Sequence, residues 1–284
     1  MKTENGNSLS LNCTSCFNKH IYRFIFIVLS SLFFIPVAFP GTPIYFRTIE
    51  KSKPDDIFIN TTNDIFLLKK GIVERYNSDG VFIQNYGSIY INEHTEIISV
   101  NGFKTILFSP DYGKIIQLDN RLRELDVVDA YSLQNYIITC IGSSYDNNFL
   151  WIWDAATQRL VKMDKDQKAI FTSNTISMLT GKKINPRQIL ESGILLYLVD
   201  RQDGIFIFDN QGNYIKNIPI ENIRNVTVID GALYYVKDNT IYSYDNLTFT
   251  ETRYTKTPEL RNIQIGKTII CGVNKDGFAE IWKF

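Results

Sequence analysis

The feature that most constrains this chain is an internal repeat. Short apolar runs end at an Asp or Asn five times, at Asn77, Asp119, Asp164, Asp209 and Asp245. The separations between successive positions are 42, 45, 45 and 36 residues. Internal periods of roughly 20 to 50 residues are typical of repeat architectures, in which each period forms one structural unit. We therefore predict one repetitive body over most of the chain.

Within each period the apolar segments have the composition of β-strands. The runs are rich in Ile, Leu, Val, Tyr, Phe and Trp and are bounded by Gly, Asn and Asp, and many lack a clean polar alternation, which indicates burial on both faces. Turn signals separate them, such as Ser192-Gly193 and Asp230-Gly231, whose residue types accept the positive φ of tight turns. Four strands joined by short turns in every period describe one blade of a β-propeller.

Six such blades fit the sequence. Their limits fall near residues 55–88, 96–129, 136–173, 187–220, 225–255 and 261–284. The last blade has only three strands, and an unpaired strand edge promotes aggregation. The strand-like segment 44–51 can supply the missing strand, which gives about 40 residues per blade over residues 44–284. We expect an all-β, six-bladed β-propeller closed by its N-terminal strand, with a β-sandwich or a seven-bladed ring as alternatives.

One blade carries a family resemblance. Segment 197–218, YLVDRQDGIFIFDNQGNYIKNI, resembles a repeat of the NHL and six-bladed propeller superfamily, in which a G-I-x-x-F-D-x-x-G stretch recurs. The similarity extends over residues 44–284, although only this blade matches closely. The whole is also similar to exported propellers of bacterial envelopes. This resemblance implies a fold and a location rather than an activity.

The N-terminal 40 residues form a separate segment. Residues 24–39 are an uncharged apolar run, preceded by Lys19, His20 and Arg23 and followed by Pro40. This order is typical of a secretory signal peptide. The run has about 16 residues, short of the roughly 20 that span a bilayer, so an uncleaved membrane anchor and a buried helix remain open. We expect residues 1–40 to be a signal peptide or anchor helix, and residues 44–284 to be exported, either periplasmic or anchored facing the periplasm.

The cysteines fall into two pairs. Cys13 and Cys16 form a CxxC before the apolar run, which alone is a weak indication of a metal or redox site. Cys140 and Cys271 lie in apolar strand-like runs. We expect them to be buried free thiols, with a disulfide as the alternative.

Charge and histidine content exclude several functions. The chain has 30 Lys+Arg against 30 Asp+Glu, so it lacks the basic excess of a nucleic-acid-binding domain. Of its 2 histidines, only His94 follows the N-terminal segment, in the polar stretch NEHTE. This excludes multi-histidine metal sites and any Ser-His-Asp or Cys-His triad that does not use His94.

One class of propeller enzyme remains as an alternative. Lactonase-like hydrolases hold a divalent cation in the central channel with Glu, Asn and Asp side chains. Inner strands here are poor in acids, and Glu96, Glu191 and Asp230 are the main candidates. Acidic turns at Asp164 and Asp200 resemble fragments of calcium loops, but turn formation accounts for them. We expect no metal and no cofactor.

A binding role fits the sequence better. In a propeller, the turns between the second and third strands share one face with the connections between blades, and binding residues concentrate on loops that a rigid scaffold positions. Tyr and Arg are favoured interface anchors. The candidates on these turns are Asp111, Tyr112, Arg201 and Asp203.

The longest interruption of the repeat, residues 174–186, adds further candidates. Lys182 and Lys183 are expected to project into solvent, and Met178 and Leu179 could cover the ring. We predict a monomeric, non-enzymatic binding or scaffold protein of the bacterial cell envelope. Its partner would be another envelope protein, and the membrane would be reached only through an uncleaved N-terminal segment.

Overall fold

The computed structural model describes residues 41–50, 52–99, 102–133, 136–146, 148–223, 225–246 and 248–284. The expected signal or anchor segment and the CxxC lie outside the described residues. Within the part of the chain that is described, no helix is long and apolar enough to cross a membrane.

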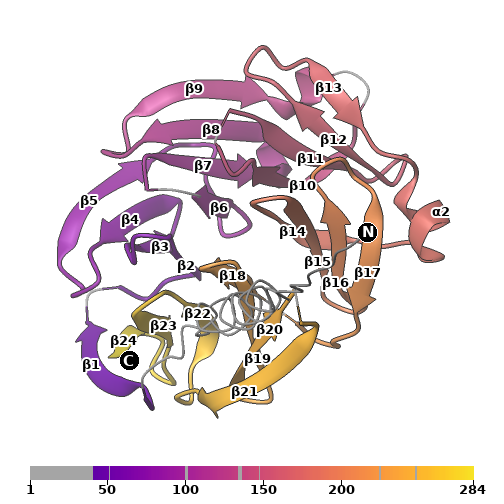
Figure 1. Ribbon diagram of the computed structural model, residues 1–284. Coiled ribbons are helices and arrows are strands. Elements are labelled where there is room, and N and C mark those ends of the chain that lie inside the picture. Colours follow the sequence, from indigo (N-terminus) through magenta and orange to yellow (C-terminus); the bar gives the residue numbers. More distant parts are fainter. Residues whose placement is uncertain are drawn as a thin grey trace, which may run out of the picture. The chain divides into compact units, whose positions relative to one another are not determined.

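Twenty-four strands of the described residues form six four-stranded antiparallel sheets arranged in a ring (Figure 1). Blade 1 contains β2 (Asp56–Ile59), β3 (Ile65–Lys69), β4 (Ile72–Tyr76) and β5 (Phe82–Gly87). Blade 2 contains β6 (Glu96–Ser99), β7 (Lys104–Ser109), β8 (Lys114–Asp119) and β9 (Glu124–Asp129). Blade 3 contains β10 (Ile138–Ser143), β11 (Leu150–Asp154), β12 (Arg159–Met163) and β13 (Ala169–Thr172). The predicted limits of these three blades are confirmed to within a few residues.

The second half of the ring repeats the pattern. Blade 4 contains β14 (Pro186–Ser192), β15 (Leu195–Asp200), β16 (Gly204–Asp209) and β17 (Tyr214–Ile218). Blade 5 contains β18 (Val226–Ile229), β19 (Ala232–Lys237), β20 (Thr240–Asp245) and β21 (Thr250–Lys256). Blade 6 contains β22 (Arg261–Ile265), β23 (Ile269–Val273), β24 (Ala279–Lys283) and, as its outer strand, β1 (Ile44–Ile49). The expected six-bladed ring is confirmed.

The two ends of the propeller close the ring, as expected. β1 pairs antiparallel with β24, from Ile44 opposite Lys283 to Ile49 opposite Ala279. Ile49 is buried in an apolar cluster with Ile57 of blade 1 and Ile281 of blade 6. The closing strand therefore joins the last blade to the first through side chains as well as through backbone pairing.

The repeated Asp or Asn forms the turn between the third and fourth strands. In blade 2, Asp119 Oδ1 accepts backbone hydrogen bonds from Arg121 and Arg123, both at 2.8 Å. The same two-bond arrangement recurs at Asn77, Asp164 and Asp209. A side-chain oxygen in such a turn replaces backbone partners that the strands no longer supply. The oxygens of Asp164 thus have the turn-forming role predicted for them.

The core lies between neighbouring blades, and large aromatic side chains fill much of it. Trp151 and Trp153 of blade 3 are fully buried against Leu196 and Phe206 of blade 4. Burying one large apolar side chain stabilises a fold by about 1.5–3 kcal/mol. Both cysteines among the described residues, at positions 140 and 271, are buried free thiols, as expected.

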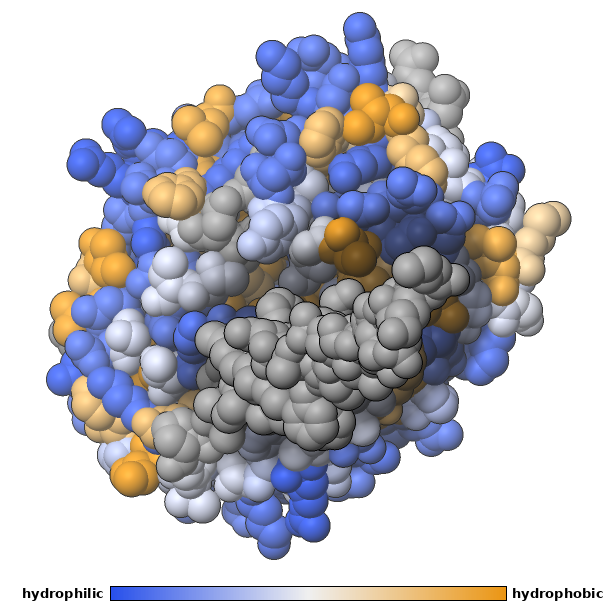
Figure 2. All heavy atoms as spheres, viewed as in Figure 1, coloured by the Kyte–Doolittle hydropathy of each residue, from blue (hydrophilic) through white to orange (hydrophobic). Residues whose placement is uncertain are grey.

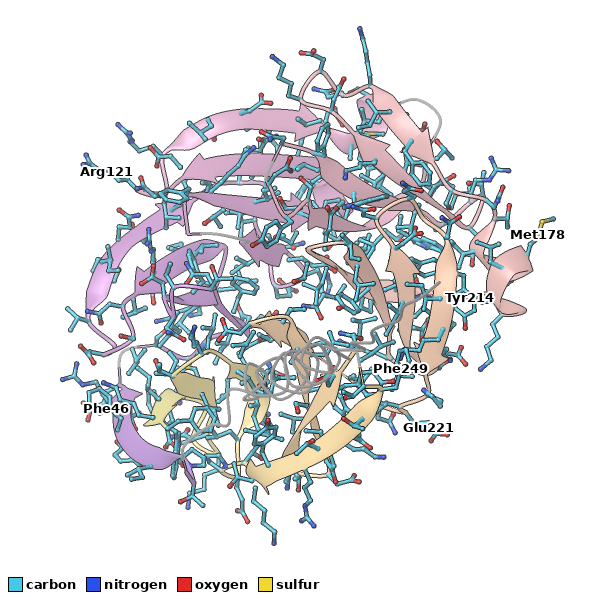
Figure 3. The ribbon with its side chains drawn as sticks, viewed as in Figure 1. Phe46, Arg121, Met178, Tyr214, Glu221 and Phe249 are labelled. Carbon is cyan, nitrogen blue, oxygen red and sulfur yellow. The ribbon has the colours of Figure 1, made fainter. Side chains whose placement is uncertain are left out.

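The long connection between blades 3 and 4 contains the short helix α2 (Ile176–Thr180). Ile176 is buried, and Leu179 packs on the apolar cluster between these two blades. Met178 is 85% exposed and lies at the outer edge of the ring (Figure 3). The expectation that Met178 covers the ring is therefore wrong, because Ile176 and Leu179 occupy the inward positions of this single helical turn.

Candidate functional site

The strands of every blade alternate in direction, so the turns divide between two faces of the ring. We call the face with the second-to-third-strand turns and the blade-to-blade connections the loop face. A cavity of about 860 Å³ runs through the ring and is lined by the first strands of all six blades. On the side shown in Figure 2, hydrophobic residues form small separate groups among hydrophilic ones.

Two acids and two arginines are among the charged side chains that line the cavity near the loop face. Asp56 begins β2 and Glu96 begins β6, whereas Arg187 lies in β14 and Arg201 in the turn between β15 and β16. Blade 4 lies across the six-bladed ring from blade 1 (Figure 1). The two guanidinium groups therefore belong to the blade opposite that of Asp56, whereas Glu96 belongs to blade 2, which is separated from blade 4 by blade 3.

The surroundings of the carboxylates favour their protonated forms. Desolvation of half-buried Glu96 raises its pKa to about 7, although the charge of Arg187 acts in the opposite direction. The side chain of Asp56 is exposed within the channel, but the protein around it excludes much of the surrounding water. This desolvation raises the pKa of Asp56 as well. The nearby charge of Arg201 partly opposes this effect.

His94 and Asp111 lie at the rim of the same channel. Nδ1 of His94 is 2.8 Å from Oδ2 of Asp111, and Asn92 donates to this oxygen at 2.6 Å. The hydrogen bond with Asp111 raises the pKa of His94, and its counterpart lowers the pKa of Asp111. Both side chains are exposed. The structure thus places the candidate Asp111 beside the channel together with the candidate Arg201.

Three tyrosines surround the turn between β7 and β8, and we call Tyr90, Tyr112 and Tyr131 the tyrosine cluster. The rings of Tyr90 and Tyr112 meet edge to face, with centroids 6.2 Å apart. The ring of Tyr131 lies over Gly113 and leaves no room for a side chain there. Tyr112 is 43% exposed and Tyr131 is 69% exposed. The sequence pointed to Tyr112 alone, because Tyr90 and Tyr131 lie in connections that the strand pattern does not align.

The remaining candidates lie elsewhere on the loop face. Lys182 Nζ pairs with the carboxylate of Asp203, which fastens the connection containing α2 to blade 4. This carboxylate raises the pKa of Lys182. Lys183 is exposed. Instead of one site, the structure thus separates the six candidates into the channel rim, the tyrosine cluster and this connection.

The three acids that could suit a cation are also separated. Glu96 lines the channel near the loop face, whereas Asp230 lines it near the opposite face and forms an ion pair with Lys267 at 3.0 Å. Glu191 lies between blades 3 and 4, where its carboxylate is 3.5 Å from Lys162 Nζ. Among the described residues, no group of three or more His, Cys, Asp or Glu could hold a metal ion.

Comparison with known proteins identifies the fold. No protein-family model and no curated protein matches the chain. Its structure is similar to selenomethionine-substituted virginiamycin B lyase from Staphylococcus aureus, with a TM-score of 0.52 and 14% identity over 84% of this chain and 87% of the other. The catalytically inactive lyase with quinupristin gives a TM-score of 0.51 and 15% identity over 85% and 87%.

A chain of the mitotic checkpoint complex is also similar, with a TM-score of 0.52 and 10% identity over 80% of this chain and 73% of the other. Identities this low show the fold alone. The six four-stranded sheets and the closing strand β1 also show a propeller. This chain is a six-bladed β-propeller.

Proposed function

We propose that this chain is a non-enzymatic binding protein that docks a partner protein on its loop face through the tyrosine cluster. The observation that carries the proposal is the exposure of Tyr112, on one turn of the loop face, and of Tyr131, whose ring lies over that turn. Tyrosine supplies a large contact area at a small cost in side-chain entropy, and it is enriched among the residues that dominate binding energies.

The turn that carries the tyrosine cluster is held rigidly. Pro110 begins the short 3-10 helix η1 (Pro110–Tyr112), and Gly113 ends it in the left-handed conformation with φ 58°. Lys114, the next residue, forms an ion pair with Asp129 at 3.0 Å. A surface that is already ordered loses little conformational freedom on binding, so more of the contact energy contributes to affinity.

The proposal places the protein in the bacterial cell envelope. Residues 1–40 would act as an export signal or membrane anchor, and residues 44–284 would form a monomeric propeller facing the periplasm, with another envelope protein as its partner. Support for this location comes from the apolar run 24–39 and the basic residues before it.

The hydrolase alternative needs a bound cation. Calcium titration of the purified protein tests it, with Asp230→Ala and Glu191→Ala as variants. Our proposal expects no stoichiometric calcium binding. Tight binding of one equivalent that either substitution abolishes would favour the hydrolase.

Site-specific photocrosslinking tests the docking surface. A benzophenone amino acid is introduced at position 112 or at position 194, and the full chain is irradiated in intact cells. Ile194 is 72% exposed on the opposite face, so it is a matched control for accessibility. We expect one defined crosslinked protein from position 112 and none from position 194. Equal crosslinking from both positions, or none from position 112, would contradict the proposal.

A further inference from the structure

The mouth of the central channel carries positive and negative side chains on different blades. Arg187 and Arg201 belong to blade 4, whereas Asp56 and Glu96 belong to blades 1 and 2. We propose that this mouth binds a short peptide with free termini, whose carboxylate meets the two arginines and whose ammonium group meets the two acids. The inference goes beyond the proposed function, because it needs no partner protein at the tyrosine cluster.

The arginines are available for a ligand. Both Arg187 and Arg201 are exposed, and no hydrogen bond or ion pair of their side chains occurs within the described part of the chain. Two other arginines are paired: Arg75 binds Asp64 at 2.5 Å and Arg123 binds Asp119 at 2.6 Å. A guanidinium group presents several donors in a plane and binds a carboxylate through two parallel hydrogen bonds.

The acids of blades 1 and 2 decide between classes of ligand. The acids and the arginines interact electrostatically, since the charges of Arg187 and Arg201 partly oppose the rise in the pKa of Glu96 that desolvation causes, and Arg201 does the same for Asp56. A phosphate or another purely anionic ligand would leave the desolvated carboxyl groups of Asp56 and Glu96 without a cationic partner. A ligand with a positive group at its other end gives both the arginines and the acids a partner of opposite charge.

The cavity has the size and lining for such a ligand. Its volume of about 860 Å³ lies within the range of roughly 300–1,000 Å³ common for small-molecule sites. Apolar residues from all six first strands also line it, namely Phe58, Ile98, Ile141, Leu190, Val228 and Ile265. An extended peptide spans at most about 3.6 Å per residue, so two to four residues bring the termini roughly 7–14 Å apart.

Calorimetric titration of the full chain with dialanine, trialanine and tetra-alanine tests the assignment. Each peptide is compared with its N-acetylated form and its C-terminal amide. We expect one length to bind best and each blocked form of that peptide to bind at least about tenfold more weakly, because one charged contact is lost. Equal binding of free and blocked peptides, or no binding of any peptide, would overturn the proposal.

Variants locate the two halves of the site. Arg201→Gln should remove the preference for the free carboxylate over the amide but keep the preference for the free amine. Asp56→Asn should do the reverse, and Arg159→Gln, an exposed change at the start of β12 beside another turn of the loop face, should change neither. Each preference is a ratio measured on the same folded variant, so a loss of stability alone does not alter it. If Arg201→Gln keeps the full carboxylate preference, the assignment fails, whatever the crosslinking at position 112 shows.

Discussion

The carboxylate of Glu191 in blade 4 accepts a hydrogen bond from the indole N–H of Trp151 in blade 3. The same carboxylate lies 3.5 Å from Lys162 Nζ, and this ammonium group is 4.9 Å from the centre of the Trp151 ring. The side chain of Glu191 is only 7% exposed. These three residues therefore form a buried polar contact between the two blades, in which the carboxylate, the indole N–H and the ammonium group each have a partner.

We expect Glu191→Ala to lower the free energy of unfolding by about 3–5 kcal/mol, because it leaves the buried charge of Lys162 without its partner. Urea denaturation measures the change. Glu221→Ala, at an exposed position on the outside of the ring (Figure 3), should change the free energy by less than about 0.5 kcal/mol. Glu191→Ala with unchanged stability but lost calcium binding would instead make Glu191 a metal ligand.

Glu191 also illustrates which properties of this protein can be predicted from its sequence. The blades were predictable because Asp119 and its equivalents repeat a local turn, and local turns leave a residue signature. The partner of Glu191 was not predictable, because Trp151 lies in another blade and no local pattern reports the packing between blades. For the same reason Tyr112 could be selected from its turn, whereas the ring of Tyr131 reaches that turn from a separate connection.

Glu96 should make the stability of the propeller depend on pH. Its pKa in the folded protein is about 7, above the ordinary value of 4.5, so the folded state binds the proton more tightly than the unfolded state. The stabilising contribution of protonated Glu96 is complete below pH of about 4.5 and is lost as the pH rises through about 7. Glu96→Gln removes this titration but keeps the groups that face Glu96, namely Asp56, Arg187 and Arg201.

Glu96→Gln should therefore match the wild type near pH 4 and exceed it by about 2 kcal/mol near pH 8, allowing for screening by water in the channel. Urea midpoints measured across this range test the difference. Wild-type and variant curves that stay parallel from pH 4 to 8 would show that Glu96 titrates normally.

Gly204 occupies a position that only glycine fits. Its φ is 94°, and an added Cβ would collide with the backbone carbonyl oxygen of Ile218. Gly193 also has a positive φ, 59°, but has nothing within 4 Å of an added Cβ. We expect Gly193→Ala to cost about 1 kcal/mol and Gly204→Ala to cost more than about 3 kcal/mol, because the second change adds a collision to the strain. Thermal denaturation compares the two, and equal costs would contradict the close approach at Gly204.

Ring closure by β1 can be tested within that strand. Ile49 is 6% exposed and packs on both blade 1 and blade 6, whereas Ile44 is 71% exposed in the same strand. Ile49→Ala should lower the free energy of unfolding by about 2–5 kcal/mol, and Ile44→Ala by less than about 1 kcal/mol. Chemical denaturation of the two variants measures this difference. Equal small effects would mean that β1 contributes little to the closed ring.

The buried thiols should not react while the propeller is folded. Cys140 and Cys271 are fully buried, and burial raises the pKa of Cys271 to about 12 and that of Cys140 well above its usual value. Only the thiolate attacks a disulfide reagent, so both low access and a low thiolate fraction suppress the reaction.

With Cys13 and Cys16 replaced by Ser, two of the 4 cysteines remain. Ellman's reagent at pH 8 should then detect no thiol in the native protein and both thiols in urea. A rapid reaction in the native state would contradict their burial, and no thiol in urea would show that Cys140 and Cys271 form a disulfide.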